Sequence, residues 1–182
     1  MMDQPGLQIL TLDSAPADDH DVTAAWERAR FTARGGTASE VRAAFGRAWS
    51  MVERLEKNER RELPFLRDLC ADYSVALVHD GDIRRAVRVA DAGLVDLPGD
   101  LALTFHRGDF ARRLGDWDQA EALLTSCFKP RSVSTISADD ARFRTIEPTF
   151  RLAQLQLARG MINDAWKQVD RALSFDDEHV PS

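Results

Sequence analysis

Several residue types are scarce in this chain, and each scarcity excludes a class of protein. Only two of its 182 residues are cysteines, Cys70 and Cys127, and they form no CxxC pair, which argues against a disulfide framework or a zinc site. No stretch approaches the roughly 18–20 consecutive apolar residues of a membrane span, and the first residues lack the basic region and apolar core of a secretory signal. We therefore expect a cytoplasmic protein without membrane insertion, whose two thiols are buried.

The balance of charge narrows the choice of partner. The chain carries 24 Lys and Arg against 30 Asp and Glu, a formal net charge of −6, and its sequence pI is near 5.2. A nucleic-acid-binding protein normally concentrates positive charge, so this balance argues against a nucleic-acid partner. Hydrophobic residues make up 44% of the chain and charged residues 30%, the ordinary balance of a globular domain of this length.

Breakers of regular structure are also few, with 10 glycines and 7 prolines. Apolar residues recur at intervals of three and four along most of the chain, which predicts helices throughout and an all-α fold class. The one strand-like run, at residues 7–12, has no second strand to pair with. We interpret it as part of a flexible tail over residues 1–19.

Three segments align on a glycine between two helical patterns: residues 79–94, 113–128 and 158–173. In each segment an apolar residue follows the glycine after one position, and an alanine follows three residues later. Gly81 and Gly115 lie 34 residues apart, and Gly115 and Gly160 lie 45 apart. We interpret the longer spacing as the same period with an inserted loop near 129–138. A fixed period of this length is the signature of a helical repeat.

The turn within each repeat has its own signal. Glycine tolerates the left-handed conformation that ends many helices, and aspartate favours the position just before a new helix. We therefore expect the first helix of a repeat to end near Gly81 and Gly115, and the second to begin after Asp82 and Asp116.

The period and the small residues within it resemble the tetratricopeptide repeat (TPR) family, over about residues 65–175. That family's pattern has a small residue in the first helix, an alanine in the second and a proline after it. The best copy shows them as Gly108, Ala120 and Pro130. The matching small residues of the other copies are Ser74, Ala86, Ala153 and Ala165. The resemblance implies a right-handed TPR-like solenoid of antiparallel helical hairpins, with about seven or eight helices.

This interpretation divides the chain into three repeats over residues 61–182 and a hairpin over residues 20–60. The hairpin consists of two helical patterns, at residues 22–34 and 39–57, separated by a glycine pair. It is either a degenerate repeat or a cap that covers the open core of the array.

Signals of catalysis are thin. The chain has no Gly-rich phosphate loop, no G-x-S-x-G and no H-E-x-x-H motif. His106 and Asp109 share a helix face, but such a pair in a helical protein is usually a solvated one. We expect no catalytic, metal-binding or cofactor-binding residues, and hence no enzyme activity in this chain.

In the TPR family the first helices of successive repeats line a concave groove. Carried over residue by residue, the resemblance implies a partner-binding groove. Its residues are Asp72, His79, Phe105, His106, Asp109, Arg112, Arg113, Phe150, Arg151 and Gln154. Further positions on the same helices are Asp68, Ala71, Val75, Ala102 and Glu147. Exposed Phe105 and Phe150 would suit a peptide or protein partner, and the alternative places both in the core. We expect Arg112→Glu with Arg113→Glu to leave folding intact and to abolish partner capture.

Three functions compete on this evidence. The leading one is a non-catalytic protein–protein interaction or assembly scaffold that binds a peptide or protein in the groove. The second rests on residues 46–73 and the repeats that follow, which look like the repeat region attached to some bacterial family 2 glycosyltransferases. The chain would then be an accessory domain of a larger enzyme. The third is a homodimer, because the apolar ends of a short solenoid can pair with a second copy.

Overall fold

The computed structural model describes residues 21–128, 143 and 145–177, and this part of the chain folds into nine α-helices without a strand. They are α1 (Val22–Ala33), α2 (Ala38–Val52), α3 (Lys57–Glu62), α4 (Leu66–His79), α5 (Ile83–Asp96), α6 (Leu101–Arg113), α7 (Trp117–Ser126), α9 (Ile146–Ala158) and α10 (Ile162–Asp177). The predicted all-α class is confirmed. The expected tail over residues 1–19 and the inserted loop near 129–138 lie outside the described residues.

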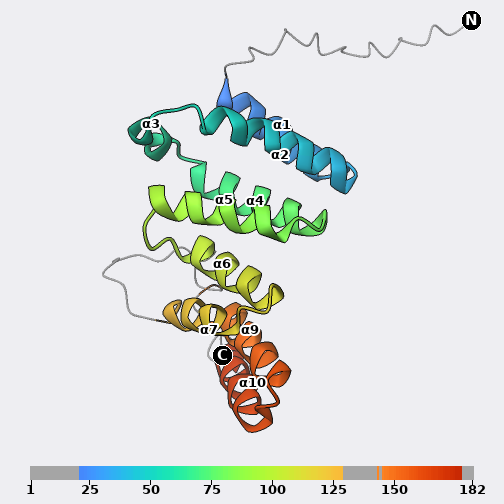
Figure 1. Cartoon of the computed structure of the whole chain (residues 1–182), viewed down its shortest axis with the longest axis vertical. Helices are drawn as coiled ribbons and strands as arrows, with labels where there is room; N and C mark the ends of the chain where they lie inside the picture. The colour runs from blue at the N-terminus through green and yellow to red at the C-terminus, as the bar shows by residue number, and fades with distance from the viewer. Residues whose placement is uncertain (1–20, 129–142, 144, 178–182) are drawn as a thin grey trace, which may run out of the picture.

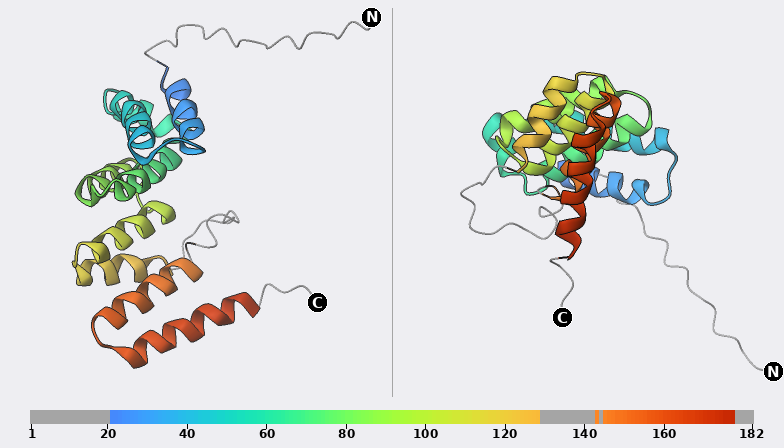
Figure 2. Two further views of the ribbon diagram at one scale, coloured as in Figure 1. Left: turned by 90° about the vertical axis from the view of Figure 1, so that its right-hand side faces the viewer. Right: turned by 90° about the horizontal axis from the view of Figure 1, so that it is seen from below.

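The helices pack as sequential antiparallel pairs: α1 with α2, α4 with α5, α6 with α7, and α9 with α10. Each pair also packs on the next, through α2 on α4, α5 on α6 and α7 on α9. The pairs therefore follow one another in chain order along the longest axis of the molecule, with α1–α2 at one end and α9–α10 at the other (Figure 1). The left-hand view of Figure 2 shows the same order from the side.

The predicted turn chemistry is confirmed. The glycines between paired helices have positive φ angles of 87° at Gly81, 80° at Gly115 and 76° at Gly160. The next helix is then capped by aspartate: the Asp82 carboxylate accepts from the backbone N–H of Arg85, and that of Asp116 from Gln119. Both devices satisfy backbone groups that a helix end leaves without an intrahelical partner.

One predicted helix ends earlier than expected. The pattern at residues 39–57 predicted one helix, but α2 ends at Val52, and a short helix that the sequence did not predict, α3, begins at Lys57. A new helix starts here because the Glu56 backbone N–H donates to the Glu59 carboxylate at 2.8 Å, half of a capping box. The guanidinium of Arg60 on α3 then holds the buried carboxylate of Asp96 through two hydrogen bonds of 2.6 and 3.2 Å. This extra helix raises the count above the expected seven or eight.

The core between paired helices depends on small residues. Ala86, Ala120 and Ala165 are at most 2% exposed. A Cβ atom at Gly108 would lie only 3.0 Å from Cγ of Leu124 on the paired helix, so glycine sets how closely α6 and α7 approach. Cys70 and Cys127 are fully buried, as predicted. Burial raises the pKa of the Cys70 thiol to about 12, which keeps it protonated and unreactive.

Candidate functional site: a groove along the first helices

An open groove of about 690 Å³ runs along the first helices of three successive pairs, α1, α4 and α6. We call it the first-helix groove. Its lining residues are Arg30, Ala33, Arg34, Val41, Phe45, Arg67, Asp68, Ala71, Asp72, Val75, Ala76, His79, Ala102, His106 and Phe143. The volume lies in the range of sites that bind a small ligand or a few residues of a peptide.

Part of the predicted site lies in this groove. Three of the ten predicted residues line it, namely Asp72, His79 and His106. Four further positions that the sequence placed on the same helices also line it: Asp68, Ala71, Val75 and Ala102. The structure therefore brings together the predicted α4 residues with Ala102 and His106 of α6.

The two phenylalanines have different environments. Phe105 is only 4% exposed and packs against Phe143, with ring centroids 5.2 Å apart, so the core alternative describes it. Phe150 is 49% exposed, and the guanidinium of Arg151 lies 5.4 Å from its ring centroid. Of the two aromatic anchors considered from the sequence, only Phe150 is available to a partner in this structure.

Sequence reasoning missed the lining residues of α1 and α2. Because residues 20–60 were interpreted only as a hairpin, their side chains were not projected onto a groove. Arg30 and Arg34 lie four residues apart at the end of α1, a spacing that places them on one helix face and could have located them. Phe143 was missed for another reason, since it belongs to no repeat pattern.

Both signs of charge meet in the groove. α4 contributes Asp68 and Asp72, one helical turn apart, and α1 contributes the guanidinium of Arg30. α4 also contributes Arg67, whose charge is paired with Asp100 at 3.3 Å. Partial burial raises the pKa of Asp72, the negative charge of Asp68 adds to the effect, and the charge of Arg30 opposes it. Apolar side chains such as Val75 and Phe45 also line the groove. The groove can therefore favour a ligand that carries a cation toward α4 and an anion toward α1.

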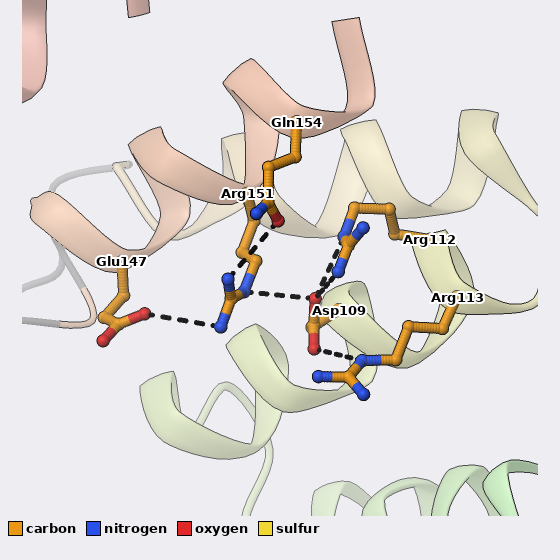
Figure 3. A network of polar contacts seen from close by, with 6 residues as sticks. All are labelled: Asp109, Arg112, Arg113, Glu147, Arg151 and Gln154. Carbon is orange, nitrogen blue, oxygen red and sulfur yellow. Dashed lines mark hydrogen bonds and ion pairs between the residues drawn. The ribbon is translucent and has the colours of Figure 1, made fainter. Parts of the chain in front are cut away.

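The remaining predicted residues form a separate ionic cluster centred on Asp109 (Figure 3). This carboxylate is 4% exposed. Arg112 donates to it at 3.0 and 2.8 Å, and Arg113 donates at 2.8 Å. Nε of Arg151, on α9, lies 3.2 Å from the same carboxylate. Asp109 thus joins α6 to the next pair of helices, and it does not face the groove as a free acid.

Arg151 has two further partners on its own helix. Its guanidinium donates to the Gln154 side-chain oxygen at 3.3 Å and lies 3.9 Å from the carboxylate of Glu147 (Figure 3). Burial alone would raise the pKa of Asp109. The hydrogen bond from Arg112 and the positive charges of the three arginines outweigh burial and lower it. The main role of this cluster is structural, because it links α6 of one helix pair to α9 of the next.

The direction of this pKa shift predicts a pH dependence of stability. A lowered carboxyl pKa stabilises the fold fully above the unfolded value, and the contribution is lost as pH falls through the folded value. We expect Asp109→Asn to lower the free energy of unfolding by about 1–3 kcal/mol near pH 7, since it removes charge-assisted hydrogen bonds. In urea unfolding, the difference from the wild type should shrink as the pH falls from about 4 to about 2.

A matched substitution at the surface serves as the control. Asp91 also pairs with an arginine, Arg107, at 2.7 Å, but its side chain is 53% exposed. Asp91→Asn should therefore cost less than about 1 kcal/mol at any pH. An Asp109→Asn deficit that stays constant down to about pH 2 would contradict the account of the cluster.

The described residues contain no group of three or more His, Cys, Asp or Glu side chains arranged to hold a metal ion. Within the same residues, no helix has the length and apolar character needed to cross a membrane. Comparison with known protein families finds none that matches the chain, and comparison with curated proteins finds no match either.

Proposed function

We propose that the chain is a non-catalytic interaction scaffold, built as a TPR-like right-handed solenoid, that binds an extended segment of a peptide or protein in the first-helix groove. The observation that carries this proposal is the groove itself. Three successive first helices share it, and it combines an apolar lining with carboxylates from α4 and guanidiniums from α1. A linear segment is the ligand that can contact several repeats at once.

The packing between pairs supports a concave surface on this side. Two of the three neighbouring pairs of first helices touch, α4 with α6 and α6 with α9, whereas α1 and α4 share no contact of this extent in the described residues. In the part of the chain described, the second helices α5 and α7 share less contact than the first helices α4 and α6 of the same two pairs. An array that is held closer along one side curves toward that side. Curvature of this kind creates the extended binding surface of repeat proteins.

The charges of the groove indicate which segment would fit. Asp68 and Asp72 would pair with a lysine, an arginine or a free amino terminus. Arg30 and Arg34 would pair with an acidic side chain. Apolar side chains of the ligand would pack between them on the lining of α4 and α6. We therefore expect a ligand with a basic residue, a short apolar stretch and an acidic residue.

A displayed library of random peptides tests the proposal, because the selection itself supplies the ligand. Peptides enriched on the wild-type protein are labelled, and their affinity is measured by fluorescence anisotropy. Ala71→Trp fills the groove with an indole and should weaken binding at least about tenfold, the effect of losing a central contact. Asp72→Lys should weaken binding most for the peptides that carry a basic residue.

Ala122→Trp is the matched control, because Ala122 is exposed on α7 and does not line the groove. It should leave the affinity unchanged. Melting curves of all three variants must stay close to that of the wild type, so that a lost affinity reports the groove. Peptides that bind Ala71→Trp and the wild type equally would refute the groove as the binding site.

A further inference from the structure

A row of four apolar side chains runs along one face of α10, and three of the four are exposed. Ile162, Trp166 and Leu173 are 59%, 62% and 61% exposed, and Val169 lies in line with them. Their spacing of four, three and four residues places all four on one helix face. Ala165 lies on a neighbouring face of α10 and is only 2% exposed. The contact of α10 with α9 therefore uses the face of Ala165 and not the face of these four residues. We call the four residues the α10 stripe.

Exposed apolar side chains are concentrated at this end of the molecule. Among the described residues, eleven large hydrophobic side chains are exposed, and seven of them belong to α9, α10 or the turn between these helices. The α9–α10 pair forms one end of the described array (Figure 1), where α10 packs on α9. A concentration of this kind marks an interaction surface, whereas single exposed hydrophobic residues are ordinary.

The order of residues in the α10 stripe is symmetric. Reversing the helix about the midpoint between Lys167 and Gln168 places Ile162 on Leu173, and Trp166 on Val169. Two such helices packed antiparallel about a twofold axis at that midpoint would therefore match large apolar residues throughout. The spacing is that of alternating a and d positions in a heptad, which pack against one another in antiparallel helix pairs.

We propose that the chain forms a homodimer in which α10 packs antiparallel on α10 of a second copy. In this dimer Ile162 contacts Leu173 of the second copy, and Trp166 contacts Val169 of the second copy. Such an interface is isologous, since each copy contributes the same surface. Asn163 and Asp170 flank the stripe on the side away from Ala165. They would meet across the axis, where the amide can donate to the carboxylate and favour the antiparallel direction.

The mass in solution tests the dimer. Light scattering coupled to size exclusion, at loading concentrations from about 1 to about 200 µM, should show the wild type rising to twice its 20.4 kDa chain mass. Trp166→Glu with Leu173→Glu should stay at the chain mass over the whole range and keep the wild-type helix content. The control, Val95→Glu with Leu114→Glu, alters two exposed apolar residues on other elements and should dimerise like the wild type.

Disulfide cross-linking tests the direction and register. With antiparallel packing, a mixture of Ile162→Cys chains and Leu173→Cys chains should form a cross-linked dimer on mild oxidation. Ile162→Cys alone should not, because its two copies would lie about 16 Å apart along the helix axis, beyond the reach of a disulfide. The native thiols are buried and should not compete.

Three results would overturn the proposal. They are a wild type that remains monomeric at about 200 µM, a stripe variant that still dimerises, and an Ile162→Cys chain that cross-links to itself more readily than the mixture does. A monomer whose stripe is covered by a different protein falls under the first of these. Peptide binding in the first-helix groove would survive all three, so the two proposals fail separately.

Discussion

Ala120→Asp should unfold the chain or come close to doing so. Ala120 is fully buried on α7, in the core that also contains Ala111 and Leu124. A carboxylate there has neither space nor a partner, and burying it unpaired costs on the order of 4 kcal/mol or more. For a domain of this length, that cost corresponds to a fall in melting temperature of roughly 8–16 °C. Thermal unfolding followed by circular dichroism measures it directly.

Ala122→Asp is the matched control for this prediction. It makes the same substitution two residues along the same helix, at an exposed position. We expect a change within about 0.5 kcal/mol, which is typical of surface substitutions. If both variants melt with the wild type, Ala120 does not occupy the tight position between α6 and α7, and the alignment of the repeats is incorrect.

Arg112→Glu with Arg113→Glu should be the second most damaging change, and its cause differs from the one that the sequence suggested. Both guanidiniums hydrogen-bond to the buried Asp109, so the double substitution places three carboxylates together where two donors stood. Removing the partners of a buried charge costs about 3–5 kcal/mol. We therefore expect a large loss in the free energy of unfolding, measured in urea, whether or not a partner is bound.

A double-mutant cycle separates this explanation from a general effect of charge. In an Asp109→Asn background the same two substitutions no longer face a buried carboxylate, and they should cost about 1–3 kcal/mol less than in the wild type. Equal costs in both backgrounds would show that Asp109 is not the group through which Arg112 and Arg113 act. Loss of partner capture by the double variant alone is therefore no evidence for a binding role of these arginines.

Local signals in the sequence were sufficient to predict most helices and the turns between paired helices. Glycine at Gly81 and Gly115 and aspartate at Asp82 and Asp116 determine backbone conformation through their own chemistry, so the helix ends could be predicted. The break at α3 could have been found too, since Glu56 and Glu59 have the spacing of a capping box. The spacing of apolar residues by three and four continues to Leu55, three residues beyond the end of α2, and so concealed the break.

The candidate site was predicted less completely because it depends on distances between helices. Periodicity places Asp109 and Arg113 on one face of α6, but it does not say that Arg151 of α9 reaches the same carboxylate. Because of this contact with Arg151, Asp109 links two pairs of helices, whereas the sequence had suggested that it lines a binding groove. The burial of Phe105 was missed for the same reason, because Phe105 packs against Phe143, a residue that matches no position of the repeat pattern.

The two proposed surfaces have a joint consequence. The first-helix groove involves α1, α4 and α6, whereas the α10 stripe lies at the far end of the array (Figure 1). A dimer through α10 would leave both grooves open. Two weak sites in one particle hold a ligand with two matching segments more tightly than either site alone, by an amount set by the spacing of the segments.

The central claim is that a peptide segment occupies the first-helix groove, and backbone amide chemical shifts measured during a peptide titration test it most directly. With a peptide selected on the wild-type protein, the account predicts that the largest shifts cluster on the groove faces of α1, α4 and α6, around Asp72, Val75 and His106. Shifts that cluster on α5 and α7, with those three residues unmoved, would contradict it.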